Sequence, residues 1–159
     1  MLDKYIIPYI KKPLEFGANL LIQCNITANQ ITIIGFMIGI LTVPALWFEH
    51  YILSLIFIII NRICDGLDGA IARQSKITEA GGFLDISLDF LFYALVPFGF
   101  ILANPDQNAI AGALLIVSFV GTGSSFLAFA SVAAKLGIEN PTYQNKSLYY
   151  IAGITEGTE

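Results

Sequence analysis

Four long apolar stretches constrain the fold of this chain more than any other feature of its sequence. Each is close to the ~20 residues that an α-helix needs to cross a lipid bilayer. They cover residues 31–48, 51–73, 82–103 and 109–134. Hydrophobic residues make up 56% of the chain and charged residues 13%, about half the charged share of soluble domains. We therefore expect an all-α, polytopic transmembrane helix bundle with four crossings.

The positive charges predict the orientation of these crossings. The eight cationic residues are Lys4, Lys11, Lys12, Arg62, Arg73, Lys76, Lys135 and Lys146. If the N-terminus is cytoplasmic, all of them fall on, or nearest to, the cytoplasmic side, as the positive-inside rule requires. The two opposite turns contain only Glu49, His50 and Asp106 as ionisable groups.

The first 30 residues mix apolar side chains with lysines and are interrupted by Pro8 and Pro13. They lack the long apolar core and the cleavage site of a signal peptide. We expect an interfacial amphipathic segment on the cytoplasmic face of the membrane. Thr27 or Asn29 is suited to be the N-cap of the first crossing.

Four aspartates lie within the second and third apolar stretches, where an ionised carboxylate is costly unless it is paired, hydrated or metal-bound. They are Asp65, Asp68, Asp85 and Asp89. At 100° per residue, each pair lies on one helix face, and only residues 74–80 connect the two helices. We expect antiparallel neighbours whose acidic stripes face each other. Small residues share these stripes, and they are Gly69, Ala72 and Gly81.

Converging carboxylates without histidine or cysteine ligands favour a hard divalent cation such as Mg²⁺, Mn²⁺ or Ca²⁺. Mg²⁺ commonly binds together with substrate phosphates, and Arg73 is close enough in the sequence to contact a phosphate or a base. The set therefore indicates phosphoryl chemistry on a diphosphate.

The pattern DxxDGxxAR(x7)GxxxDxxxD resembles the signature of the CDP-alcohol phosphotransferases. Its fixed positions are Asp65, Asp68, Gly69, Ala72, Arg73, Gly81, Asp85 and Asp89. The segment NITANQIT also resembles the start of the first membrane helix in such enzymes, with Ala28 where a proline is common. The chain looks like a poorly characterised bacterial branch of this family.

The resemblance implies an enzyme that displaces CMP from a CDP-alcohol, often CDP-diacylglycerol, by the hydroxyl of a second alcohol. It forms a phosphodiester in phospholipid biosynthesis. By matching positions, Asp65, Asp68 and Asp85 hold Mg²⁺ or Mn²⁺, and Asp89 completes a dinuclear site or acts as the general base. The CDP pocket is implied to be lined by Gly69, Ala72, Arg73 and Gly81.

The implied partners are a CDP-alcohol donor, an alcohol acceptor and the lipid bilayer, with a possible homodimer and no nucleic acid. The implied location is the bacterial inner membrane, with the site on the cytoplasmic side. Family members usually have about six crossings, whereas here a fifth helix only begins near Lys146. We expect residues 1–159 to form a single membrane domain, apparently truncated at the C-terminus.

Several of these features have alternative interpretations. The aspartates also suit a cation transporter or channel, since intramembrane acids mark ion pathways. A catalytically inactive relative that binds lipid or nucleotide is a further alternative. Arg62 suits either a nucleotide contact or a topology anchor that extends to the interface. Gly35 and Gly39 form a GxxxG pair that suits a dimer seam or, more commonly, internal packing.

Overall fold

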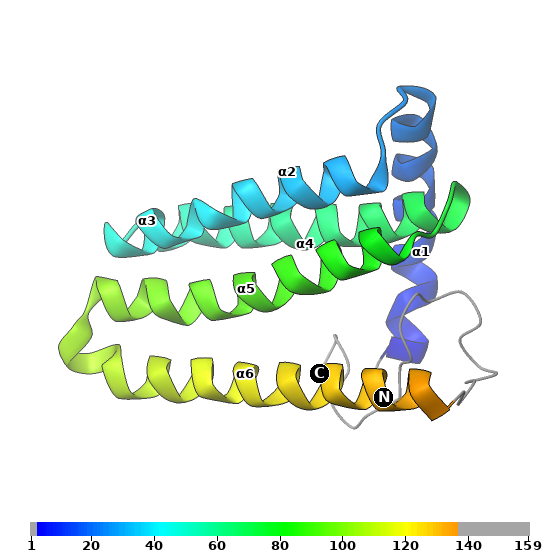
Figure 1. Cartoon of the computed structure of the whole chain (residues 1–159). Helices are drawn as coiled ribbons and strands as arrows, with labels where there is room; N and C mark the ends of the chain where they lie inside the picture. The colour runs from blue at the N-terminus through cyan, green and yellow to red at the C-terminus, as the bar shows by residue number, and fades with distance from the viewer. Residues whose placement is uncertain (1–2, 137–159) are drawn as a thin grey trace.

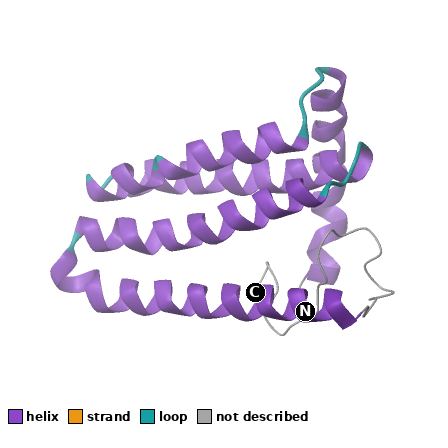
Figure 2. Cartoon of the chain, viewed as in Figure 1, coloured by secondary structure: helices purple, strands orange, loops and turns teal. Residues whose placement is uncertain are grey.

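The computed structural model describes residues 3–136, and this part of the chain is helical (Figure 1). The helices are α1 (Asp3–Gln23), α2 (Ala28–Ile40), α3 (Thr42–Trp47), α4 (Tyr51–Gln74), α5 (Glu79–Ala103) and α6 (Pro105–Leu136). Figure 2 shows short connections between them and no strand in the described region. The all-α prediction is confirmed. The predicted start of a fifth crossing near Lys146 lies outside the described residues.

Three apolar segments are long enough to cross a membrane: Ala28–Trp47, Glu79–Ala103 and Pro105–Ala133. The first of them comprises α2 and α3, which meet at Leu41. Although α4 has 24 residues, it carries the charges of the acidic stretch and is more polar. It runs beside α2 and α3 and connects opposite ends of the bundle (Figure 1). Because α4 is not among the three apolar spans found in the described residues, the second of the four predicted crossings stays a prediction.

The helix α1 lies across one end of the bundle, roughly perpendicular to the other helices (Figure 1). A small core attaches it to α2 and α4, and its buried members are Ala18, Ile31, Ala70 and Ile71. On the outside of α1, the side chains of Lys11, Lys12 and Phe16 are exposed. This placement agrees with the interfacial segment expected from the sequence.

The first crossing begins with a capping box. The backbone N–H of Gln30 donates to the Thr27 hydroxyl, and the Thr27 backbone N–H donates to the Gln30 side chain at 2.9 Å. Two amide groups that the helix itself cannot satisfy are thereby paired. Of the two predicted caps, the structure selects Thr27. Thr78 caps α5 similarly, accepting from the N–H of Gly81 at 3.0 Å.

Glycines allow α2 to lie directly against α4. A Cβ added at Gly35 would be 2.5 Å from Cys64 Cβ, and one added at Gly39 would be 2.9 Å from Asn61 Nδ2. The GxxxG pair therefore serves internal packing in this chain. This close approach sets the distance between α2 and the acidic face of α4.

Replacement of Gly35 by leucine is expected to lower the free energy of unfolding by about 1–3 kcal/mol, because the larger side chain must displace α2 from α4. The measurement is thermal unfolding of the purified protein in detergent. Gly121→Leu is the matched control, since nothing lies within 4 Å of a Cβ added there. Equal melting temperatures for the two variants would contradict the prediction.

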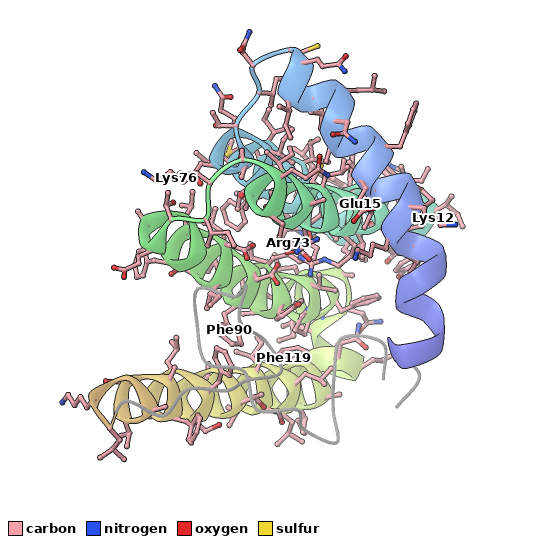
Figure 3. The ribbon with its side chains drawn as sticks, turned by 90° about the vertical axis from the view of Figure 1, so that its right-hand side faces the viewer. Lys12, Glu15, Arg73, Lys76, Phe90 and Phe119 are labelled. Carbon is pink, nitrogen blue, oxygen red and sulfur yellow. The ribbon has the colours of Figure 1, made fainter. Side chains whose placement is uncertain are left out.

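The last described helix, α6, packs against α5 through aromatic side chains. Phe90 and Tyr93 of α5 face Phe126 and Phe119 of α6, with ring centroids 6.5 and 5.7 Å apart respectively. Figure 3 shows Phe90 and Phe119 between the two ribbons. Large apolar side chains elsewhere on α6, such as Ile110 and Leu114, are exposed. An exterior of this kind suits contact with lipid tails.

Candidate metal and substrate site

The four aspartates line one cavity between α2, α4 and α5. The full lining consists of Thr32, Gly35, Phe36, Asn61, Asp65, Asp68, Asp85, Leu88 and Asp89. The acidic stripes of α4 and α5 therefore face each other, as their helical spacing predicts.

The backbones of α4 and α5 do not pack closely along their described lengths. Instead, α2 contacts both helices, and so does α3. Arg62 extends across the space from α4 to reach α5. The prediction of antiparallel neighbours holds in direction, but the two helices are separated by polar side chains. This separation leaves space for the cavity.

Three of the carboxylates form a compact cluster. Asp65, Asp68 and Asp85 each offer one oxygen, and these oxygens lie within 4.8 Å of one another. Asp68 is the most buried of them, with 4% of its surface exposed. Its Oδ2 atom accepts a hydrogen bond from the Thr32 hydroxyl at 2.5 Å. Thr32 on α2 thus fixes a carboxylate of α4.

This cluster has the chemistry of a divalent cation site. Three oxygen ligands from two helices converge, and the cluster contains neither histidine nor cysteine. Hard oxygen donors of this kind suit Mg²⁺ or Mn²⁺ rather than zinc or copper. The carboxylates of Asp65, Asp68 and Asp85 could therefore hold a metal ion.

Asp89 lies beside the cluster and is engaged by other groups. Its Oδ1 atom accepts from Arg62 Nη2 at 2.5 Å, and its Oδ2 atom accepts from the Tyr93 hydroxyl at 3.1 Å. Arg62 Nη1 donates to the Tyr93 oxygen at 3.0 Å and lies 3.6 Å from Asp65 Oδ2. The guanidinium thus stands between two of the four carboxylates.

The inward position of Arg62 settles an alternative that the sequence left open. Its guanidinium points into the bundle and pairs with Asp89, so it does not extend to the membrane interface. Sequence reasoning also missed Thr32 and Tyr93. Spacing contained a signal for Tyr93, which follows Asp89 by one helical turn, just as Arg62 precedes Asp65 by one turn. No comparable signal existed for Thr32, whose partner is far away in the sequence.

The other residues of the pattern lie nearer the end of the bundle, where α4 stops and α5 begins. Arg73 is exposed, and its Nη1 atom would be 3.1 Å from a Cβ added at Gly69 (Figure 3). A Cβ at Gly81 would be 2.9 Å from Asn29 Oδ1. Together with Ala72, these residues are absent from the cavity lining in the described structure. The structure therefore brings the aspartates together and leaves the small residues and Arg73 at the adjoining helix ends.

Comparison with known proteins identifies the family of this chain. The family model described as CDP-alcohol phosphatidyltransferase matches residues 25–150. Inner membrane protein YnjF of Escherichia coli (strain K12) is 57% identical over 159 residues, which cover 100% of this chain and 77% of that protein.

Archaeal relatives are more distant. Archaetidylinositol phosphate synthase of Pyrococcus horikoshii is 42% identical over 76% of this chain and 64% of its own length. A bifunctional IPC transferase and DIPP synthase of Archaeoglobus fulgidus is 32% identical over 59% of this chain and 20% of its own length. No solved structure matches. The chain is a membrane protein that belongs to the CDP-alcohol phosphatidyltransferase family.

Proposed function

We propose that this protein is an integral membrane phosphotransferase that displaces CMP from a CDP-alcohol by the hydroxyl of a second alcohol. The observation that carries the proposal is the cluster of Asp65, Asp68 and Asp85, with oxygens within 4.8 Å of one another in a chain of this family. A cation transporter also needs intramembrane carboxylates, but membership in the transferase family favours the enzyme.

In this proposal Asp65, Asp68 and Asp85 hold Mg²⁺ or Mn²⁺. When bound there, the cation would neutralise negative charge on the diphosphate. The nucleotide end of the donor lies toward Gly69, Ala72, Arg73 and Gly81. Arg73 is suited to contact this end because its guanidinium is exposed near the end of α4.

Asp89 is the proposed general base. Both of its oxygens accept hydrogen bonds, but a carboxylate has about four lone-pair sites, so each oxygen can accept once more. The acceptor hydroxyl transfers its proton to Asp89 as its oxygen forms a bond to the phosphorus. The bond from that phosphorus to the CMP oxygen breaks, and CMP departs.

The donor and acceptor can be ranked by chemistry and by the relatives. CDP-diacylglycerol is the first donor to test, because the apolar exterior of the bundle suits lipid chains. An inositol phosphate is the first acceptor to test, because one relative is named archaetidylinositol phosphate synthase. Glycerol phosphate and serine are the next acceptors.

The proposed location is the inner membrane, with the site opening to the cytoplasm. The main support for this location is the similarity to an inner membrane protein. In addition, α1 and the end of α6 that contains Lys135 lie at the same end of the bundle as Arg73 and Lys76 (Figures 1 and 3). A water-soluble acceptor from the cytosol would reach the site from that end.

The test is a CMP-release assay on the purified protein in detergent or lipid, with a panel of CDP-alcohols and acceptors. Release is expected to stop with EDTA and to return with Mg²⁺ or Mn²⁺, because the site contains only oxygen ligands. Release that persists without divalent metal would contradict the metal role. Cation flux in proteoliposomes, together with no CMP release from any pair, would support the transporter instead.

Thr32→Val is expected to weaken Mn²⁺ binding about 10-fold to 100-fold. The substitution keeps the shape of the side chain but removes the hydroxyl that orients Asp68, and loss of such outer partners commonly has an effect of this size. Mn²⁺ titration followed by calorimetry measures it. Thr122→Val, on the exposed face of α6, is the control. Wild-type affinity in Thr32→Val would show that the hydroxyl does not support the metal site.

A further inference from the structure

We propose that Arg62 is a positioning residue that fixes the Asp89 carboxylate at the edge of the metal cluster, and that Asn61 and Tyr93 hold Arg62 in place. The inference rests on the proposed phosphotransferase function and adds a residue outside its sequence pattern. It assigns Arg62 to the general base rather than to the substrate.

The link between Arg62 and Asp89 connects two helices whose backbones lie apart. Arg62 belongs to α4 and Asp89 to α5, and their side chains meet at 2.5 Å in the space between these two helices. Both side chains are partly shielded, with 31% and 26% of their surfaces exposed. A charge-assisted hydrogen bond in such a place is shorter and stronger than a neutral one. It can therefore determine where the carboxylate of α5 lies.

Arg62 itself has little freedom to move. Its Nε and Nη2 atoms donate to Asn61 Oδ1 at 2.9 and 2.6 Å. Its guanidinium carbon lies 5.1 Å from the ring centroids of both Phe92 and Tyr93. Aromatic rings at this distance attract the cation and orient its plane.

Asn61 attaches this assembly to a third helix. It is 5% exposed, and its Nδ2 atom donates to the backbone oxygen of Gly35 on α2 at 3.0 Å. A Cβ at Gly39 would be 2.9 Å from the same nitrogen, so the amide fits closely against α2. The network of Asn61, Arg62, Tyr93 and Asp89 therefore joins α2, α4 and α5.

These contacts fix the orientation of the Asp89 carboxylate. Arg62 holds one of its oxygens and Tyr93 holds the other, so rotation of the carboxylate would break at least one bond. Each of the three guanidinium nitrogens of Arg62 donates to a protein group, as expected for a residue that acts through Asp89. Displacement of a reacting group by about 1 Å can cost ~100-fold in rate.

A double-mutant cycle tests this assignment. In steady-state CMP release, Arg62→Met is expected to lower kcat about 10-fold to 100-fold and to change KM for the CDP-alcohol by less than about threefold. Arg62→Lys should recover part of the loss. In a chain that already carries Asp89→Asn, Arg62→Met should cost less than about threefold, because a residue that acts through Asp89 has nothing left to position.

Tyr93→Phe provides a second variant in case Arg62→Met does not fold, since it removes one hydroxyl and keeps the ring. It should lower kcat in the wild-type chain and have almost no effect beside Asp89→Asn. Additive losses in both cycles would overturn the inference, as would a large rise in KM with unchanged kcat, which indicates substrate contact. If wild-type protein releases no CMP with any pair, the proposed function itself fails, and that result is distinct from additivity.

Discussion

Asp85→Asn is expected to lower the rate of CMP release about 1,000-fold. Asp85 is the contribution of α5 to the cluster, while Asp65 and Asp68 both belong to α4. Asparagine keeps the shape of the side chain but removes its charge, so a cation would lose its ligand on the α5 side of the cavity. Loss of several kcal/mol of charge stabilisation in the transition state corresponds to a rate effect of about this size.

The measurement for Asp85→Asn combines the CMP-release rate with Mn²⁺ affinity. Both should fall, while the melting temperature without metal should stay close to that of the wild type. Asp106→Asn is the matched control, because Asp106 is exposed in the first turn of α6 at the opposite end of the bundle. An active Asp85→Asn protein would rule out the proposed role of the cluster.

Most of the helices could be predicted from sequence because the constraint on them is simple. A crossing needs about 20 apolar residues, and three of the four predicted stretches recur as long apolar spans. Local chemistry also narrowed the N-cap of the first crossing to Thr27 or Asn29, and in the structure Thr27 pairs with Gln30, three residues away. Interactions of this short range are readable from one segment at a time.

The arrangement of the helices could not be read in the same way. Short connections predict antiparallel order, but they do not reveal that α2 and α3 contact both α4 and α5 while those two remain apart. That arrangement depends on Gly35 and Gly39, which allow α2 to approach α4 closely. A GxxxG pair alone suits several partners, so only the three-dimensional contacts identify this one.

Spacing predicted which aspartates share a face, but it did not divide them into groups. Asp65, Asp68 and Asp85 form a compact cluster, whereas Asp89 is engaged by Arg62 and Tyr93. The division depends on long-range side-chain contacts. Arg62 illustrates why such contacts are hard to predict. A membrane interface and a carboxylate both stabilise a cation, and the sequence alone does not show which of the two surrounds Arg62.

Asp89→Asn is expected to lower kcat for CMP release about 100-fold while Mn²⁺ affinity stays within about threefold of the wild type. A neutral amide cannot take the proton of the acceptor hydroxyl, and loss of a general base commonly has an effect of at least this size. Metal affinity should survive because the three clustered carboxylates are unchanged and Asp89 is already paired with Arg62. The two measurements together separate Asp89 from Asp85, whose loss should reduce both. If Mn²⁺ affinity falls in Asp89→Asn as far as in Asp85→Asn, then Asp89 is a metal ligand, and the removal of the hydroxyl proton must be assigned to another group.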